Sequence, residues 1–189
     1  MSKKIIAFAG SIRNGSINAN ALRYAIEGAR AAGADVEVIN LKEYPMPLYD
    51  ADWHTANGVP QSVLELRAKM IAAQGLLIAS PEYNASITPL LKNTIDWLSQ
   101  SVKDGLGQGG GGLPFQNKIV GLMGASAGGF GAVRALPHVA AILSNLGAIV
   151  LPVVAIPAAD KITHTDGSVV NERATKMLQD LGGRVAKMV

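Results

Sequence analysis

Short apolar runs alternate along this chain with longer segments of helical period, and this alternation constrains the fold more than any other feature. Strands are expected at residues 4–9, 36–41, 76–79, 118–123 and 149–156, with the last one bent at Pro152. Helices are expected at residues 17–32, from Pro60 through Ala73, from about Thr88 to about Gln100, up to Leu146, and at 170–188. Because parallel strands joined by helices form a doubly wound sheet, we predict an α/β fold: a flavodoxin-like three-layer sandwich with a five-stranded parallel sheet of order 2-1-3-4-5.

Three stretches depart from the regular pattern. Residues 42–59 contain two prolines and a glycine and are expected to be irregular. The glycine-rich segment Gly105–Gly112 is expected to be a flexible loop. Pro137 falls inside the helix that should follow the fourth strand, where it would kink the helix or delay its start. Since no internal repeat or linker is found, residues 1–189 are expected to form one domain.

The composition excludes several classes of function. Hydrophobic residues make up 49% of the chain and charged residues 16%, which is typical of a filled globular interior. The chain has no cysteine, so thiolate catalysis and disulfides are excluded and redox chemistry would need a bound cofactor. The net charge of +3 comes from scattered Lys and Arg residues, so no nucleic-acid partner is expected.

Hydropathy gives no indication of a membrane partner. No stretch approaches the roughly 20 apolar residues that a membrane span requires. The apolar run from Ile5 to Ala9 is too short for a signal peptide. The expected location is therefore the cytoplasm.

The first loop that carries chemistry is GSIRNGSIN, residues 10–18, between the first strand and the first helix. Ser11 and Ser16 offer hydroxyl groups, Arg13 offers a guanidinium, and the helix start offers free N–H groups. Together these groups predict a cradle for a phosphate dianion, at the edge of the sheet where such folds bind ligands. The alternative is a plain strand-to-helix turn with a serine cap.

Two nucleotide-binding motifs are absent from this loop. The dinucleotide fingerprint G-x-G-x-x-G would need glycine where Ile12 stands. A nucleoside-triphosphate loop would need lysine where Ser16 stands.

A second loop follows the third strand, and a third loop follows the fourth. Pro81 restricts the backbone of the second loop, and Tyr83 and Asn84 supply groups for the edge and wall of a planar ring. The alternative is that Tyr83 only packs and Asn84 only forms a turn, while Ser86 or Thr88 caps the next helix. The third loop, GASAGGFG at 124–131, consists of small residues that allow a planar group to approach the main chain.

These motifs resemble the NADPH-dependent FMN reductase family, and within it the bacterial quinone and chromate reductases. The likeness rests on the GSIRNGSIN loop, the PEYN loop with its TPLLKNTIDWLS helix, and the SAGG loop, and covers nearly the whole chain. It implies a bound FMN and hydride transfer from NADPH or NADH through the flavin to quinones or similar small acceptors, including chromate, azo compounds or free flavin. It also implies a homodimer or homotetramer.

The same resemblance implies which residues contact the cofactor. The FMN phosphate and ribityl chain would contact Ser11, Arg13, Ser16, Ile17 and Asn18. The isoalloxazine ring would be lined by Pro81, Glu82, Tyr83 and Asn84, with Ser126, Gly128 and Gly129 near its far side. No catalytic side chain is assigned, because the flavin carries the chemistry. No metal site is expected, because the histidines share no ligand spacing.

Two rival functions are considered. Residues 124–128 match G-x-S-x-G, so Ser126 with Asp160 and His164 would make a serine hydrolase. Asp160 and His164 are only four residues apart, however, and this function leaves the first two loops unexplained. The other rival is a flavodoxin-type electron carrier without NAD(P)H activity, although such carriers usually present acidic surfaces and this chain is basic.

Overall fold

A computed structural model describes residues 3–101, 113–159 and 171–189. The strands are β1 (Lys4–Ala9), β2 (Asp35–Ile39), β3 (Gly75–Ala79), β4 (Ile119–Ala125), β5 (Ile149–Val150) and β6 (Val154–Ile156). The helices are α1 (Ile17–Ala31), η1 (a 3-10 turn, Leu41–Glu43), α2 (Ala51–Asn57), α3 (Gln61–Ala72), α4 (Pro89–Leu98), α5 (Ala135–Asn145) and α6 (Glu172–Met188).

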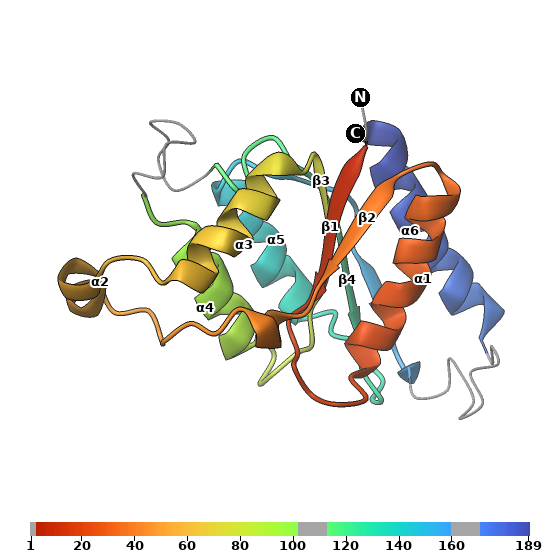
Figure 1. Ribbon diagram of the computed structural model, residues 1–189. Helices are drawn as coiled ribbons and strands as arrows, with labels where there is room; N and C mark the ends of the chain where they lie inside the picture. Colours follow the sequence, from red (N-terminus) through yellow and green to blue (C-terminus); the bar gives the residue numbers. More distant parts are fainter. Residues whose placement is uncertain (1–2, 102–112, 160–170) are drawn as a thin grey trace.

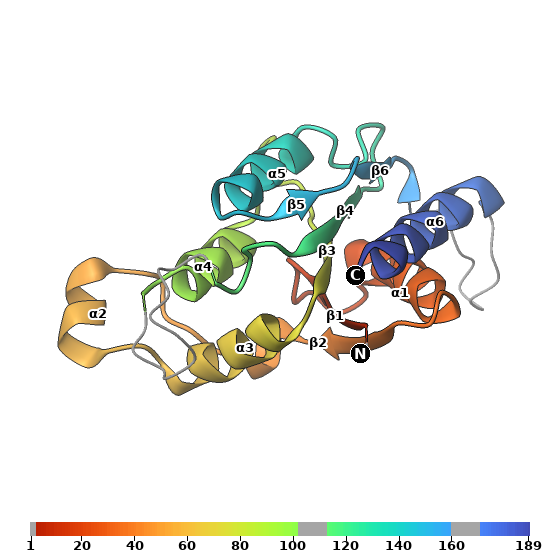
Figure 2. The same ribbon diagram turned by 90° about the horizontal axis from the view of Figure 1, so that it is seen from above.

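The strands form one parallel sheet in the order β2-β1-β3-β4-β5, with β6 also paired to β4. Helices α1 and α6 cover one face, and α3, α4 and α5 cover the other (Figure 2). The predicted flavodoxin-like topology and its three layers are therefore confirmed. Because every strand runs the same way, the carboxyl ends of β1, β3 and β4 lie at one edge (Figure 1).

The two faces of the sheet bury separate apolar clusters. Along β1, Ile5 and Ala7 belong to the cluster under α1 and α6, whereas Ile6 and Phe8 belong to the cluster under α3, α4 and α5. This alternation places a buried side chain at successive positions, which is the pattern of a strand covered on both faces.

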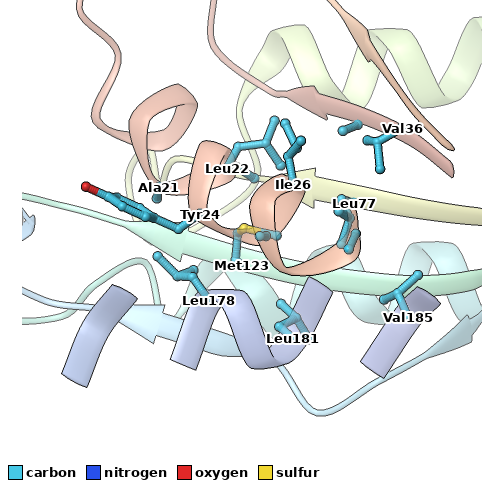
Figure 3. Close-up of a cluster of buried hydrophobic side chains, with 14 of the residues drawn as sticks. Ala21, Leu22, Tyr24, Ile26, Val36, Leu77, Met123, Leu178, Leu181 and Val185 are labelled. Carbon is cyan, nitrogen blue, oxygen red and sulfur yellow. The ribbon is translucent and has the colours of Figure 1, made fainter. Parts of the chain in front are cut away.

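Helices α1 and α6 pack closely against each other as well as against the sheet. Figure 3 shows the shared core, in which the following side chains meet: Ala21, Leu22, Tyr24 and Ile26 of α1, Leu77 and Met123 of the sheet, and Leu178, Leu181 and Val185 of α6. Gly28 and Gly182 lie where the backbones approach most closely, since a Cβ added at Gly182 would be 1.8 Å from the Ala25 carbonyl oxygen.

The structure refines the fifth strand. The predicted single strand at 149–156 is two short strands, and Pro152 lies in the gap between β5 and β6. Proline has no N–H to donate to a ladder, so the pairing with β4 stops there and resumes at Val154.

The prediction that residues 42–59 are irregular is wrong for 51–57, which form α2. Asp50 caps this helix by accepting a hydrogen bond from the Trp53 amide at 2.7 Å. The Trp53 ring packs edge-on against Trp97 of α4, with ring centroids 5.7 Å apart. A contact with a distant helix therefore supports a short helix that its own sequence does not indicate, and α2 projects from the body of the molecule (Figure 1).

Elsewhere, the residues that the sequence indicates as helix starts are found at helix starts. Ser16 caps α1 and Thr88, rather than Ser86, caps α4. Pro137 is the third residue of α5, where a missing N–H costs no helical hydrogen bond, so it marks the helix start. The loop Gly105–Gly112 lies outside the described residues. Within the described part of the chain, no helix has both the length and the apolar character to span a membrane.

Candidate active site

The three loops meet at the carboxyl edge of the sheet around a cavity of about 190 Å³. Its lining includes all of the predicted site residues except Asn84, Gly128 and Gly129: Ser11, Arg13, Ser16, Ile17, Asn18, Pro81, Glu82, Tyr83 and Ser126, with Ala125 added. Residues more than 100 positions apart are brought together because β1, β3 and β4 are neighbours in the sheet.

The first loop presents hydrogen-bond donors at the start of α1. Ser16 accepts from the Ala19 amide at 3.3 Å, and its carbonyl accepts from the Asn20 amide. The amides of Ile17 and Asn18 belong to the first turn, where no helical acceptor exists. The first turn of α1 has no acidic residue, and the exposed Arg13 side chain lies in the same loop. These groups fit a phosphate dianion.

Asn18 is buried, and both ends of its side-chain amide are bonded to Ala125. Nδ2 donates to the Ala125 carbonyl at 2.9 Å, and the Ala125 amide donates to Oδ1 at 2.9 Å. The side chain therefore ties the start of α1 to the end of β4. The main-chain amide of Asn18, in the first turn of α1, is then the donor of this residue that has no helical acceptor.

Glu82 joins the second loop to the start of α5. Its carboxylate accepts from the main-chain amides of Arg134 at 3.0 Å and Ala135 at 3.2 Å, and from Arg134 Nε at 2.7 Å. The hydrogen-bonded Arg134 guanidinium is the main reason that the pKa of Glu82 is lowered, and the two amides add to it. Glu82 thus caps α5, whose own N-terminus has no side-chain cap.

Thr88 makes a third tie. Its Oγ1 donates to the Gly10 carbonyl at 2.9 Å and accepts from the Leu91 amide at 3.2 Å, so one buried hydroxyl joins the second loop to the first. With the bonds of Asn18 and Glu82, the first loop is joined to the start of the third, and the second loop is joined to the first and to the start of α5. Hydrogen bonds from buried or partly buried side chains therefore join the segments that surround the crevice.

Ser126 stabilises the third loop. Its Oγ donates to the Gly128 carbonyl at 3.1 Å and accepts from the Gly131 amide at 3.0 Å. Of the described histidines, His138 bonds Ser86 and His54 contacts Tyr49, so neither serves Ser126. Asp160 and His164, the other members of the proposed hydrolase triad, lie outside the described residues.

Sequence reasoning missed three residues at the rim of the crevice. Arg134 pairs with Glu82 and lies over the ring of Phe130, with Cζ 4.5 Å from the ring centroid. Phe130 is 60% exposed beside Arg134, and Tyr83, which lines the cavity, is 54% exposed. His138 bonds the second loop. The sequence signal that could have indicated Arg134 and His138 is an arginine and a histidine four residues apart at the start of a helix.

Larger grooves occur elsewhere, and one of about 460 Å³ lies between α4 and α5. One of about 690 Å³ lies between α1 and α6, and one of about 620 Å³ lies between α1 and β2. Both run along the outer surface of α1. We assign the site to the smaller cavity because residues of all three loops line it, whereas the two grooves along α1 include no residue of the second or third loop.

The sheet order and its flanking helices define a flavodoxin-like α/β protein, with a crevice between three loops at the carboxyl edge of the sheet. The family model of the NADPH-dependent FMN reductases matches residues 3–161. An NAD(P)H-dependent FMN reductase of Pseudomonas aeruginosa is 35% identical over 178 residues, covering 93% of this chain and 89% of that protein. A quinone reductase of Escherichia coli is 35% identical over 154 residues, covering 80% and 76%. This chain belongs to the NADPH-dependent FMN reductase family.

A solved structure supports the fold. FerB, a flavoenzyme NAD(P)H:(acceptor) oxidoreductase from Paracoccus denitrificans, superposes with a TM-score of 0.79 at 24% identity. The match covers 98% of this chain and 96% of that one. The likeness concerns the arrangement of helices and strands.

Proposed function

We propose that this protein is an FMN-dependent NAD(P)H oxidoreductase that reduces quinones or similar small acceptors. The observation that carries the proposal is that one cavity contains both a phosphate cradle at the start of α1 and the Pro81–Tyr83 wall across the edge of the sheet. FMN has a phosphate at one end and a planar ring at the other, so the two parts of the crevice suit its two ends. Membership of the family supports the same assignment.

The residues divide into two sets in this proposal. Ser11, Arg13 and Ser16, with the amides of Ile17 and Asn18, hold the phosphate. Pro81, Glu82, Tyr83 and Asn84 form the ring wall, and Ser126 shapes the opposite loop. An added Cβ at Gly128 or Gly129 would meet nothing within 4 Å, so the main chain there is open to a flat group.

When bound, the flavin would accept hydride from NADPH or NADH and pass the electrons to the acceptor. The protein itself would hold the flavin in place and shield it from water. Fixed amides and hydroxyls at the edge of the sheet bind without having to reorganise, because the three ties keep the loops in place. The exposed rings of Tyr83 and Phe130 offer an apolar rim against which a flat acceptor can exclude water.

The test is an absorption spectrum of the purified protein before and after anaerobic addition of NADPH or NADH. Flavin bands at about 370 and 450 nm that bleach with either donor would support the proposal. Bands that persist would favour the electron carrier instead. A protein that stays colourless after addition of FMN would contradict any flavin function.

We also propose that residues 1–189 form one flavodoxin-like domain and that the protein works as a cytoplasmic homodimer or homotetramer. The projecting segment around α2 supports self-association, because Leu48 is 80% exposed and Trp53 is 38% exposed. Light scattering coupled to size-exclusion chromatography tests the assembly, and a monomer at micromolar concentration would contradict it. Assays with benzoquinone, chromate, an azo dye and free FMN would rank the acceptors.

A further inference from the structure

The residues from Tyr83 to Ser86 form a tight turn, and Tyr83 at its start lines the crevice cavity. The Tyr83 amide donates to the Ser86 carbonyl and the Ser86 amide donates to the Tyr83 carbonyl, both at 3.0 Å. Asn84 and Ala85 have φ values of 50° and 63°, in the left-handed region. Asparagine tolerates this conformation, but the Cβ of Ala85 makes it unfavourable. The surroundings must therefore hold the turn in place.

Both flanks of the turn are bonded to the start of α5. On one side, Glu82 accepts hydrogen bonds from Arg134. On the other side, Ser86 Oγ and His138 Nδ1 form a hydrogen bond of 2.9 Å. Arg134 and His138 lie about one helical turn apart at the start of α5. The residues just before and at the end of the Tyr83–Ser86 turn are therefore both held by the same end of one helix.

Tyr83 and Asn84 make no side-chain hydrogen bond to another described residue, and Tyr83 is 54% exposed. The positions of the Tyr83 and Asn84 side chains therefore depend on the main-chain conformation of the turn. That conformation depends on the hydrogen bonds at the two ends of the turn. Arg134 is itself supported by the Phe130 ring.

We propose that Arg134 and His138 are positioning residues, which hold the Tyr83–Ser86 turn in the conformation that receives the flavin ring. This inference rests on the proposed function. Neither residue lines the crevice cavity, so each acts through the turn and not by touching the ligand.

The experiment titrates apoprotein with FMN and records the visible circular dichroism of the complex, which reports the surroundings of the ring. His138→Ala removes the Ser86 bond, and we expect about a three- to tenfold weaker FMN affinity and an altered spectrum. His138→Asn, which keeps a polar atom near the position of Nδ1, should restore both. Ser144→Ala is the control, since Ser144 is an exposed polar residue of the same helix.

A second variant separates positioning from general stability. Ala85→Gly removes the Cβ that disfavours the left-handed conformation, so the turn should need less support. In that background His138→Ala should cost at least twofold less FMN affinity than it does in the wild type. The melting temperature of each apoprotein should stay within about 2 °C of wild type, because His138 is exposed.

The outcomes are distinct. If wild-type apoprotein binds no FMN, the proposed function and this inference are both overturned. If it binds FMN and His138→Ala matches it in affinity and spectrum, only this inference fails. An equal loss with and without Ala85→Gly would likewise overturn it.

Discussion

Asn18 joins the start of α1 to the end of β4 through both ends of its side-chain amide, each 2.9 Å from a main-chain atom of Ala125. The two residues are 107 positions apart. An amide is suited to this place because it donates and accepts at once, and so satisfies both main-chain groups of one buried residue. The two hydrogen bonds hold the first loop, at the start of α1, next to the loop after β4.

Replacing Asn18 with alanine should lower the free energy of unfolding by about 2–4 kcal/mol, since two buried main-chain groups would lose their partners. Urea denaturation measures the change. Asn18→Asp is the sharper comparison, because it keeps the acceptor for the Ala125 amide but points a carboxylate oxygen at the Ala125 carbonyl. A stability of Asn18→Ala equal to wild type would show that water replaces the bond.

Arg13→Ala should weaken FMN binding by about 10- to 100-fold, because a charged donor to the phosphate is lost. Stability should not change, since the Arg13 side chain is exposed. Quenching of FMN fluorescence by apoprotein measures the affinity. Arg173→Ala, which removes an exposed arginine from α6, is the matched control. Equal affinities for the two variants would refute the cradle.

Glu82 should make stability depend on pH. The Arg134 guanidinium and the amides of α5 lower its pKa from 4.5, so the folded state favours the carboxylate more than the unfolded state does. This contribution is present above about pH 4.5 and is lost as the pH falls through the lowered pKa. Glu82→Gln should therefore be less stable than wild type by about 1 kcal/mol at neutral pH, a modest value because water screens the half-exposed Arg134.

Urea denaturation of wild type and Glu82→Gln across the acid range measures this difference, which should shrink toward low pH. A difference that stays constant from pH 7 to about pH 3 would mean that the charge of Glu82 has no role in the tie.

The contact between α1 and α6 should tolerate no side chain at Gly182. An added Cβ would lie 1.8 Å from the Ala25 carbonyl oxygen, so Gly182→Ala must push the helices apart and should cost about 2–4 kcal/mol. A Cβ added at the neighbouring Gly183 would lie 3.6 Å from its nearest atom, the Gly28 carbonyl oxygen. Gly183→Ala should therefore be neutral or stabilising by up to about 1 kcal/mol through helix propensity. Thermal unfolding of the pair measures both effects, and equal melting temperatures would contradict the close contact.

The sequence by itself determined the elements whose signals are local. The apolar run at β1, the serine at the start of α1 and the threonine before Pro89 act within a few residues, so the strands and the caps were predictable. The sheet order was predictable from the alternation of strands with helices, which is typical of a doubly wound sheet. The loops at the carboxyl edge followed from that order. Pro152 likewise marked the break in the last strand.

Only the tertiary structure decided what the side chains in those loops bond to. Asn18 and Glu82 line the crevice as predicted, and the polar atoms of their side chains are bonded to Ala125 and to the start of α5. Helix α2 was missed because its support comes from Trp97, and His138 was missed because its partner is Ser86, 52 positions away. Propensity and periodicity act over a few residues, whereas these bonds form only after the strands have paired and brought distant residues into contact.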